Sequence, residues 1–459
     1  MTAWWDRDNL KPLRRALGGD KVLSTPESKV IYGKDATGLQ GHPLAVVLAE
    51  SVEDIQITVK YAIDKGLNIT PRGAGSGLSG GSIPKNGSIV LSCENMKEII
   101  DFNPDEGKIV VQPGVTTQTV QNIANEAGMF YPPDPASYTV STIGGNIAEN
   151  AGGLRCFKYG VTSHYVLGIE YVDSNGEIKG SGSIGNAVFN PDITSLLIGS
   201  EGTLGIFSKI ELRLINLPDK TITIAAYFKD IVGGFEATEK ILQSGLTPSV
   251  IEYIDKSALR AAAEYINFSV NPDAESMLLI ELDGDAEKVG SDLIQIEKLL
   301  EASSFQYEIA DNPVHRDRLW SLRRAISPSL IRMSTGKIHE DIAVPRSRLV
   351  EISTIIQEIS ESYSINIAKY GHAGDGNLHV VFLFDASDTE QKTSADKAVR
   401  SLFSKVISLG GTISGEHGIG LSKREFIPDQ LSEMNIAISK QLKDYFDPIG
   451  LFNPGKIYA

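Results

Sequence analysis

Two histidines flank a tight turn in the C-terminal half of the chain, at a spacing that suits metal coordination. The run Tyr370-Gly-His-Ala-Gly-Asp-Gly-Asn-Leu-His-Val380 places His372 and His379 on either side of a Gly-Asp-Gly-Asn turn. Residues 365–370 and 378–384 are predicted strands, so the turn would return both imidazoles toward one point. Such ligands suit zinc first, with manganese or iron as alternatives. An ordinary polar hairpin is the competing interpretation.

The motif Gly415-Glu-His-Gly418 adds two further groups that could do chemistry. Glu416 offers a carboxylate as a third metal ligand, which would leave coordination positions open for a substrate. His417 is next to that ligand in the sequence and is available as a base. A neutral imidazole accepts a proton at physiological pH, and a nearby cation would oppose its protonation. The two motifs together predict a metal site beside a general base.

A glycine-rich loop dominates the first half of the chain. A predicted strand, 67–71, runs into Arg72-Gly-Ala-Gly-Ser-Gly-Leu-Ser-Gly-Gly81. Missing Cβ atoms let such a backbone wrap closely around a ligand and direct its N–H groups at phosphate. The glycines fall as G-x-G-x-G and a strand, 88–92, follows, so the loop differs from the Rossmann fingerprint and NAD is not expected. A flexible linker is the alternative.

Further small residues follow in Pro132-Pro-Asp-Pro135, Ser141–Gly153 and Gly199-Ser-Glu-Gly-Thr-Leu-Gly205. Ser141–Gly153 shows no regular period, which favours close backbone approach to a flat ligand. Ser141, Asn146 and Asn150 could supply hydrogen bonds. A glycine-rich turn beside a tightly packed core is the alternative for this segment.

The elements that must position these groups can be read from hydrophobic periodicity. Helices are predicted over 52–65 and 117–127, and strands over 108–112 and 206–214. A domain boundary is expected near Leu217. Beyond it, predicted strands (221–228, 249–254, 277–282) alternate with predicted helices (234–243, 258–266, 287–302), which indicates an antiparallel α+β layer of ferredoxin-like type. No internal repeat stands out.

Paired guanidiniums lie in a helix-like segment, Leu319-Trp-Ser-Leu-Arg-Arg324. An acidic protein that handles an acidic substrate needs a local cation of this kind. Arginines solvated on a helix face are the alternative. The segment Lys337–Pro345 is predicted to be a strand whose charged residues line the same cavity or, alternatively, form an exposed edge.

Composition limits the class of protein. The 459 residues are 41% apolar and 22% charged, which is typical of a globular protein with several domains. A net charge of -15 argues against nucleic acid and anionic membrane as main partners. The N-terminus is charged at once and no apolar run is long enough to span a bilayer, so a cytoplasmic protein is expected. Cys93 and Cys156 allow one disulfide at most and no iron–sulfur cluster.

The motifs together resemble a known family. Pro71-Arg-Gly-Ala-Gly-Ser-Gly, Ile143-Gly-Gly-Asn, Asn150-Ala-Gly-Gly and Gly199-Ser-Glu-Gly-Thr-Leu-Gly resemble the FAD-binding domain of the vanillyl-alcohol oxidase and p-cresol methylhydroxylase superfamily. The two histidine motifs, Trp320 with Arg323, the Glu340–Pro345 segment and Phe452-Asn-Pro-Gly-Lys456 resemble the C-terminal domain of FAD-linked D-2-hydroxyacid dehydrogenases. The resemblance runs from about Lys29 to the C-terminus.

The resemblance implies a fold, a cofactor and a set of residue roles. It implies an α+β protein with a two-part FAD-binding domain over 1–217 and a ferredoxin-like substrate domain over 218–459, of which about 445–459 return to the first domain. By resemblance, His372, His379 and Glu416 hold the metal, His417 is the catalytic base and Arg323 binds the substrate carboxylate. The residues implied along FAD are Pro71, Arg72, Gly73, Ala74, Gly75, Ser76, Gly77, Pro132, Ser141, Gly144, Gly145, Asn150, Gly152, Gly153, Tyr159, Glu201, Gly202, Ile206 and Asn453.

The implied reaction is oxidation of a D-2-hydroxy acid to the 2-oxo acid, with D-lactate or glycolate as substrate and 2-hydroxyglutarate as the alternative. Related oxidases attach flavin through a histidine in the first glycine loop. Ser76 stands in this loop, which has no histidine, so non-covalent FAD is expected. Electrons would pass to a quinone, a cytochrome or an electron-transfer flavoprotein, and complex subunits or a homodimer are further expected partners. Competing interpretations are a non-catalytic FAD-binding electron-transfer subunit and a zinc hydrolase.

Overall fold

The computed structural model describes residues 9–185, 192–310 and 312–458, so the charged segment 1–8 lies outside the described residues. The chain divides into two compact units. The first unit contains 1–153, 160–217 and 416–459, and the second contains 154–159 and 218–415. The sequence placed the boundary at 217 and the return near 445. In this division the return begins at Glu416, and the short segment 154–159 groups with the second unit.

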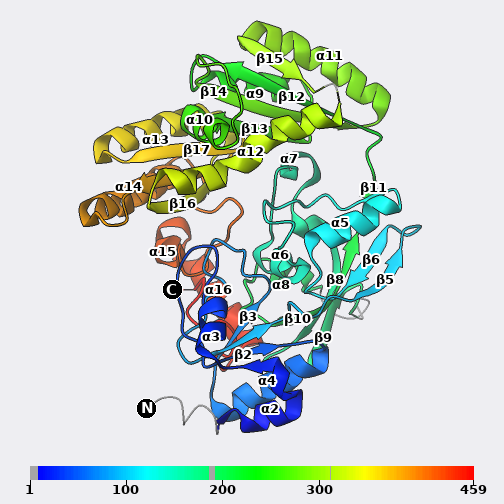
Figure 1. The fold of residues 1–459 in the computed structure, drawn as a ribbon. Coiled ribbons are helices and arrows are strands. Elements are labelled where there is room, and N and C mark those ends of the chain that lie inside the picture. The colour runs from blue at the N-terminus through cyan, green and yellow to red at the C-terminus, as the bar shows by residue number, and fades with distance from the viewer. Residues whose placement is uncertain (1–8, 186–191, 311, 459) are drawn as a thin grey trace. The chain divides into compact units, whose positions relative to one another are not determined.

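The first unit contains two main sheets and short helices (Figure 1). Its elements in chain order are α2 (Lys11–Leu17), η1 (Gly19–Lys21), β1 (Val22–Leu23), α3 (Pro26–Tyr32), β2 (Ala45–Leu48), α4 (Val52–Lys65), β3 (Ile69–Arg72), β4 (Ile89–Ser92), β5 (Ile99–Asn103), β6 (Lys108–Val111), α5 (Thr117–Glu126), β7 (Met129–Phe130), α6 (Ile143–Glu149), η2 (Thr162–His164), β8 (Val166–Val172), β9 (Ile178–Gly182), α8 (Thr194–Leu197), β10 (Ile206–Arg213), β11 (Ile215–Asn216), η4 (Arg424–Phe426), α15 (Ile427–Gln430) and α16 (Glu433–Phe446).

The smaller sheet has the order β1-β2-β4-β3, with β4 parallel to both of its neighbours. Helix α4 packs its buried apolar face into the core of this sheet. The Ser51 hydroxyl caps its N-terminus by accepting the Asp54 N–H, and Gly66 ends it at a φ of 62°. The predicted helix over 52–65 is therefore confirmed, and β3 enters the first glycine loop from this rigid base.

The C-terminal residues complete the same core. Phe452 pairs in parallel with Ile69 of β3, and its side chain is fully buried. The Asp447 carboxylate accepts the backbone N–H groups of Leu451 and Phe452, which fixes the approach of this segment. The last stretch of the chain therefore packs in the first unit.

The larger sheet of the first unit is antiparallel, with the order β5-β6-β10-β8-β9. The segment that the sequence suggested to be irregular contains a helix, α6. Thr142 caps its N-terminus by accepting the Gly145 N–H, and Asn150 ends it at a φ of 50°. A Cβ on Gly144 would lie 2.7 Å from Pro113 Cβ, so close packing against Pro113 requires glycine at this position. The same glycine weakens the helical pattern of the sequence.

The second unit is built on one antiparallel sheet of seven strands. Its elements are α7 (Cys156–Tyr159), β12 (Lys220–Phe228), α9 (Gly233–Gln243), β13 (Val250–Asp255), α10 (Lys256–Tyr265), β14 (Ser276–Gly284), α11 (Ala286–Ser303), β15 (Gln306–Ile309), α12 (Pro313–Met333), β16 (Gly336–Ala343), η3 (Arg346–Arg348), α13 (Leu349–Tyr363), β17 (Asn366–His372), β18 (Asn377–Phe384) and α14 (Thr389–Ser408).

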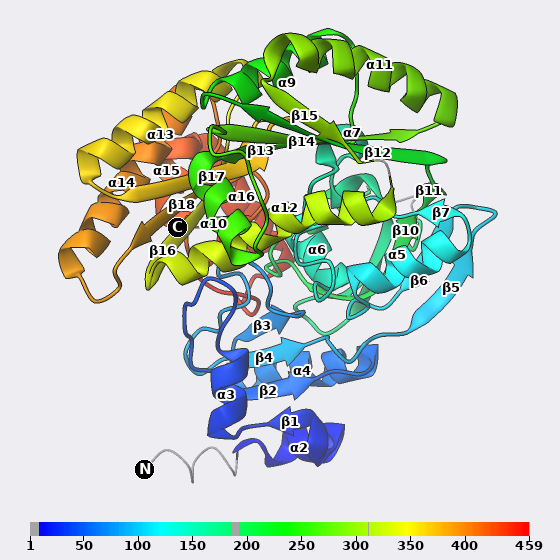
Figure 2. The ribbon, with the colours of Figure 1, turned by 45° about the horizontal axis from the view of Figure 1, so that its top comes forward.

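The strand order, β15-β12-β14-β13-β17-β18-β16, joins two related halves. The first four strands have the ferredoxin-like order, and β17-β18-β16 repeats three of its positions with α13 and α14 following in turn. The topology thus repeats where the amino-acid sequence showed no repeat. Helices α10 and α12 cover the face that holds the main apolar core, and α9, α11, α13 and α14 cover the other (Figures 1 and 2).

Among the residues that the structure describes, no helix combines the length and the hydrophobicity that a bilayer span requires.

Candidate active site

The two histidines that flank the Gly-Asp-Gly-Asn turn lie close together at the predicted hairpin. His372 ends β17 and His379 lies in β18, and their ring centroids are 5.3 Å apart. Both side chains are buried. The turn needs Gly376, because its φ is 88° and a Cβ there would lie 2.2 Å from the Val344 carbonyl oxygen. The hairpin therefore brings the imidazoles together as the spacing predicted.

Glu252 on β13 orients this pair. Its fully buried carboxylate hydrogen-bonds to His372 Nδ1 and forms an ion pair with Arg323 Nε. Burial acts to raise the pKa of Glu252, but the Arg323 guanidinium and the His372 ring outweigh it and lower the pKa to about 2. An ionised carboxylate only accepts hydrogen bonds, so His372 Nδ1 carries the hydrogen and Nε2 is the atom suited to a metal.

Arg323 and Arg324 have different environments. The Arg323 side chain is 11% exposed, and its guanidinium carbon lies 4.8 Å from the Tyr370 ring centroid. The Arg324 side chain is 53% exposed and pairs with Asp317. The solvated-arginine interpretation therefore describes Arg324, whereas α12 holds Arg323 against the sheet face that carries His372.

Strand β16 lies at the edge of the sheet, and its charged residues differ in exposure, since Lys337 is exposed whereas Glu340 and Asp341 are buried. Asp341 is opposite His379 in the strand register and is fully buried, and the adjacent Ala343 pairs with Thr412. The exposed-edge interpretation therefore describes the start of the strand, around Lys337, and not Glu340 and Asp341. His339 reaches the same place, with its ring centroid 5.4 Å from that of His379.

The chain leaves the second unit beside these residues. Gly415, the last residue of that unit, donates its backbone N–H to Asp341 Oδ2 at 2.7 Å. Glu416 follows directly in the chain. Asp341 thus fixes the point at which the chain departs toward the Glu-His motif.

The first unit holds a cavity lined by backbone and small side chains. Most of the residues predicted along FAD line it: Pro71, Arg72, Gly73, Ala74, Gly75, Ser76, Gly77, Ser141, Gly144, Gly145, Gly152, Glu201, Gly202 and Ile206. Glu416 and His417 line the same cavity, with His417 Nε2 lying 3.8 Å from Glu416 Oε1. A lining so rich in glycine suits a long, flat dinucleotide, because ligand atoms can approach the backbone N–H groups closely.

Five predicted FAD residues do not line this cavity. Asn150 caps α6 and accepts the Ser163 N–H, and Gly153 packs against Asp134. Asn453 supports the lining from behind by donating to the Gly81 and Glu201 carbonyl oxygens. Pro132 is buried elsewhere in the first unit, and Tyr159 belongs to the second unit.

Other residues at these sites were missed from the sequence. Glu252 carries no motif, and His339 lies in the predicted strand Lys337–Pro345 but was not itself named as a site residue. The pairing of distant strands brings both to His372 and His379. Three more residues line the cavity of the first unit: Cys93, which follows β4, and Thr142 and Glu149, which lie within the glycine-rich segment Ser141–Gly153. Cys93 and Cys156 do not form the one disulfide that the sequence allowed.

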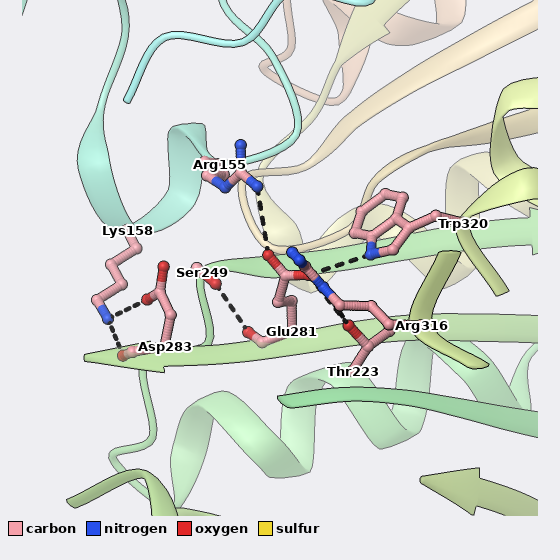
Figure 3. A network of polar contacts seen from close by, with 8 residues as sticks. All are labelled: Arg155, Lys158, Thr223, Ser249, Glu281, Asp283, Arg316 and Trp320. Atoms are coloured by element: carbon pink, nitrogen blue, oxygen red, sulfur yellow. Dashed lines mark hydrogen bonds and ion pairs between the residues drawn. The ribbon is translucent and has the colours of Figure 1, made fainter. Parts of the chain in front are cut away.

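A second buried carboxylate fastens α12 to the sheet (Figure 3). Glu281 on β14 accepts hydrogen bonds from Arg316 Nη2 at 2.7 Å, Trp320 Nε1 at 3.1 Å and Thr223 Oγ1 at 3.0 Å. Arg155, just before α7, pairs with it at 3.4 Å, and Lys158 of α7 pairs with Asp283. Burial acts to raise the pKa of Glu281, but Arg155 and Arg316 outweigh it and lower the pKa. Helix α12 is therefore held at Arg316, Trp320 and Arg323.

Comparison with known proteins gives matches over nearly the whole chain. Residues 43–181 match the family described as FAD binding domain, and residues 217–457 match FAD linked oxidases, C-terminal domain. A glycolate oxidase subunit of Bacillus subtilis (strain 168) is 35% identical, over 99% of this chain and 97% of the relative. A D-2-hydroxyglutarate dehydrogenase of Stutzerimonas stutzeri (strain A1501) is 32% identical over 96% of both chains.

A D-lactate dehydrogenase of Anaerostipes hadrus is 30% identical, over 97% of this chain and 94% of the relative. Among solved structures, p-cresol methylhydroxylase with bound substrate superposes with a TM-score of 0.81 at 18% identity, covering 99% of this chain and 97% of that chain. An alkyldihydroxyacetonephosphate synthase gives 0.75 at 18% identity, covering 98% and 85%. These likenesses confirm the expected fold.

The Glu281 network predicts a measurable loss of stability. Replacing Glu281 by Ala leaves Arg316 and the Trp320 N–H without their buried acceptor, so we expect the free energy of unfolding to fall by about 3–5 kcal/mol. Urea denaturation followed by tryptophan fluorescence measures it. Glu264→Ala, at an exposed position on α10, is the matched control and should change stability little. Equal stability of the two variants would contradict the anchoring role of Glu281.

Proposed function

The chain belongs to the FAD-linked oxidase family, and we propose that it oxidises a D-2-hydroxy acid, D-lactate or glycolate, to the 2-oxo acid. The protein is an FAD-linked oxidoreductase of hydroxy acids, as the matched relatives are named for such activities. The substrate is the proposed part. One observation supports this substrate. Glu252 contacts both Arg323 and His372, and His379 lies beside His372. A guanidinium that could bind the substrate carboxylate therefore lies near two imidazoles that could bind a metal.

We assign the substrate carboxylate to Arg323. A guanidinium has five N–H donors in a planar fork, so it can bind a protein carboxylate at one edge and a substrate carboxylate at another. Contact with Glu252 and stacking on Tyr370 fix the plane of that fork before substrate binds. This preorganisation favours recognition of a 2-hydroxy acid by its carboxylate.

We assign a divalent metal to His372, His379 and Glu416. Glu252 gives His372 the partner that metal-binding imidazoles require, and Asp341 holds Gly415, from which the chain continues directly into Glu416. The donor set of two imidazoles and one carboxylate fits zinc, with manganese or iron as alternatives. When bound, such an ion would polarise the hydroxyl and carboxylate oxygens of the substrate.

We assign the base to His417. Oxidation of an alcohol removes a hydroxyl proton and a hydride from the same carbon–oxygen unit, and FAD supplies the hydride acceptor, N5. His417 lines the glycine-rich cavity proposed for that flavin, where its imidazole would accept the hydroxyl proton. Burial raises the pKa of the Cys93 thiol in the cavity to about 12, so this thiol is no nucleophile at neutral pH. Non-covalent FAD is consistent with that.

The proposed reaction predicts a yellow protein that D-lactate or glycolate bleaches without oxygen. We expect His417→Ala to keep FAD and to slow bleaching roughly 10²–10⁴-fold, because general-base help is worth about that much. Stopped-flow absorbance with a panel that includes D-2-hydroxyglutarate measures both the rate and the preferred acid. Flavin that no 2-hydroxy acid reduces would favour a non-catalytic electron-transfer subunit instead, and normal bleaching of the variant would remove His417 from the base role.

Arg323→Ala should raise KM sharply and leave the flavin absorbance unchanged, because the variant loses the carboxylate clamp and not the flavin cavity. Arg324→Ala, one residue along the same helix but paired at the surface, is the control and should keep the normal KM. The measurement is steady-state kinetics with the acid that bleaches fastest. Similar KM values for the two variants would exclude Arg323 from substrate binding.

Removal of either imidazole should release the metal. We expect His379→Ala to purify with far less zinc, manganese or iron than the unmodified protein, as measured by elemental analysis, because the lost nitrogen is one of three protein ligands. His42→Ala, at an exposed position, should keep the normal content. Full metal content in His379→Ala would refute the ligand set, whatever the activity.

A further inference from the structure

Two glutamates, Glu149 (half-buried) and Glu201 (buried), meet at the turn that carries His417. Glu149 ends α6, and Glu201 lies in the loop Gly199–Gly205, and both line the cavity of the first unit. A Cβ built on Gly418 would lie 2.5 Å from Glu149 Oε2 and 2.9 Å from Glu201 Oε1. One atom position thus touches both carboxyl groups, so they are neighbours.

The same two side chains meet again at the first glycine loop. A Cβ on Gly81 would lie 2.7 Å from Glu149 Oε1 and 3.7 Å from Glu201 Oε2. Glu201 is 5% exposed, and its Oε2 is a buried oxygen with no hydrogen-bond partner among the described residues. A buried carboxylate oxygen requires a donor, and a protonated neighbouring carboxyl group would supply one.

The protein holds Glu201 in an unfavourable conformation to place it there. Its φ of 49° lies in the left-handed region, which non-glycine residues adopt at a cost. Its backbone N–H donates to the Ala148 carbonyl at 2.8 Å, and Asn453 Nδ2 donates to its carbonyl oxygen at 2.7 Å. Glu201 Oε1 in turn accepts the Ile419 N–H at 2.8 Å. The carboxylate therefore holds the segment immediately after His417.

The hydrogen bonds differ between the two carboxyl groups. Glu201 accepts backbone N–H groups of Ile419 and Gly420, which stabilise its charge. Glu149 accepts the Ser79 hydroxyl at 3.4 Å. Burial and the charge on Glu201 raise the pKa of Glu149 well above its usual range, and burial raises that of Glu201 to about 7. Two carboxylates that share a buried site rarely ionise together, so the proton belongs on Glu149.

The other charged groups around the pair are consistent with one shared proton. Lys456 is buried and donates to Asn453 Oδ1 at 2.7 Å, and Lys423 also faces Glu201. Asp35 and Arg72 act on the same groups from the N-terminal segments, and they oppose each other in charge. Burial lowers the pKa of Lys456 to about 7, so at neutral pH this side chain supplies only part of a positive charge. Lys423 and Arg72 then balance Asp35 and one carboxylate. A neutral Glu149 also avoids repelling the diphosphate of a dinucleotide in the cavity that it lines.

We propose that Glu149 and Glu201 share one proton and that, in this state, they are positioning residues that hold the turn carrying His417. The proposal rests on the proposed function in so far as His417 is the base. Loss of the proton at higher pH leaves two adjacent carboxylates, whose repulsion loosens the contacts at Gly418 and Ile419. Turnover therefore depends on the protonated pair, and we expect it to fall as the pH rises.

Infrared difference spectroscopy of the FAD-loaded protein tests the proton without turnover. We expect the carbonyl stretch of a protonated carboxylic acid at neutral pH, its loss in Glu149→Gln and its retention in Glu126→Gln, an exposed control at the end of α5. Equal spectra for Glu149→Gln and the unmodified protein would overturn the shared proton. This readout is independent of substrate, so it stands even when no 2-hydroxy acid is oxidised.

Kinetics test the positioning. Glu201→Gln replaces a charged acceptor of the Ile419 N–H by a neutral one, so we expect kcat to fall roughly tenfold or more with KM little changed, since a charge-assisted hydrogen bond is worth that much. The fall of kcat at alkaline pH should disappear in Glu149→Gln, which cannot ionise. Where Glu201→Gln does not fold, Gly418→Ala disrupts the same contact from the turn. An unchanged kcat, or an alkaline limb that persists in Glu149→Gln, would overturn the positioning role.

Discussion

The second unit depends on one buried carboxylate, Glu252, that binds a guanidinium and an imidazole with different uses. Glu252 binds Arg323 with one oxygen and His372 with the other, so it fixes a guanidinium and an imidazole on the same face of the sheet. Burying an ionised carboxylate is costly unless charge-assisted hydrogen bonds compensate it. Both partners therefore have to be in place for the strand β13 to pack. The contacts that let this face of the sheet fold are therefore the same contacts that orient Arg323 and His372.

In the first unit, polar residues outside the cavity hold the glycine loops that line it. Its cavity is lined by glycine loops at strand ends, and these loops are held by residues that do not touch the cavity themselves. Asn453 donates to the carbonyl oxygens of Gly81 and Glu201, and Lys456 is buried beside it. A backbone cradle has few side chains of its own with which to pack, so the polar residues behind it supply its rigidity. The C-terminal segment thus acts as support for loops that lie hundreds of positions earlier in the chain.

Local signals in the sequence predicted most elements of the fold, and they failed where tertiary contacts decide. The helix over 52–65 carries its own cap and stop residue, and the hairpin around His372 and His379 carries its own turn glycines, so both could be read directly. Helix α6 was missed because Gly144 and Gly145 interrupt the apolar pattern, and the reason for Gly144 is its contact with Pro113. Glu252 could not be found, since a lone Glu within an apolar strand has no spacing that marks it. The family resemblance supplied the roles that spacing alone left open.

The pairing of Ile69 with Phe452 has a consequence for biosynthesis. The core of the first unit includes Leu451 and Phe452, so a nascent chain cannot complete it until these two residues have left the ribosome. The second unit, whose main segment is continuous from 218 to 415, has all of its strands available earlier. Contacts of such long sequence separation slow folding and prolong exposure of apolar strands. Expression of chains truncated near the C-terminus should therefore yield an aggregating first half, and chaperone demand should be concentrated there.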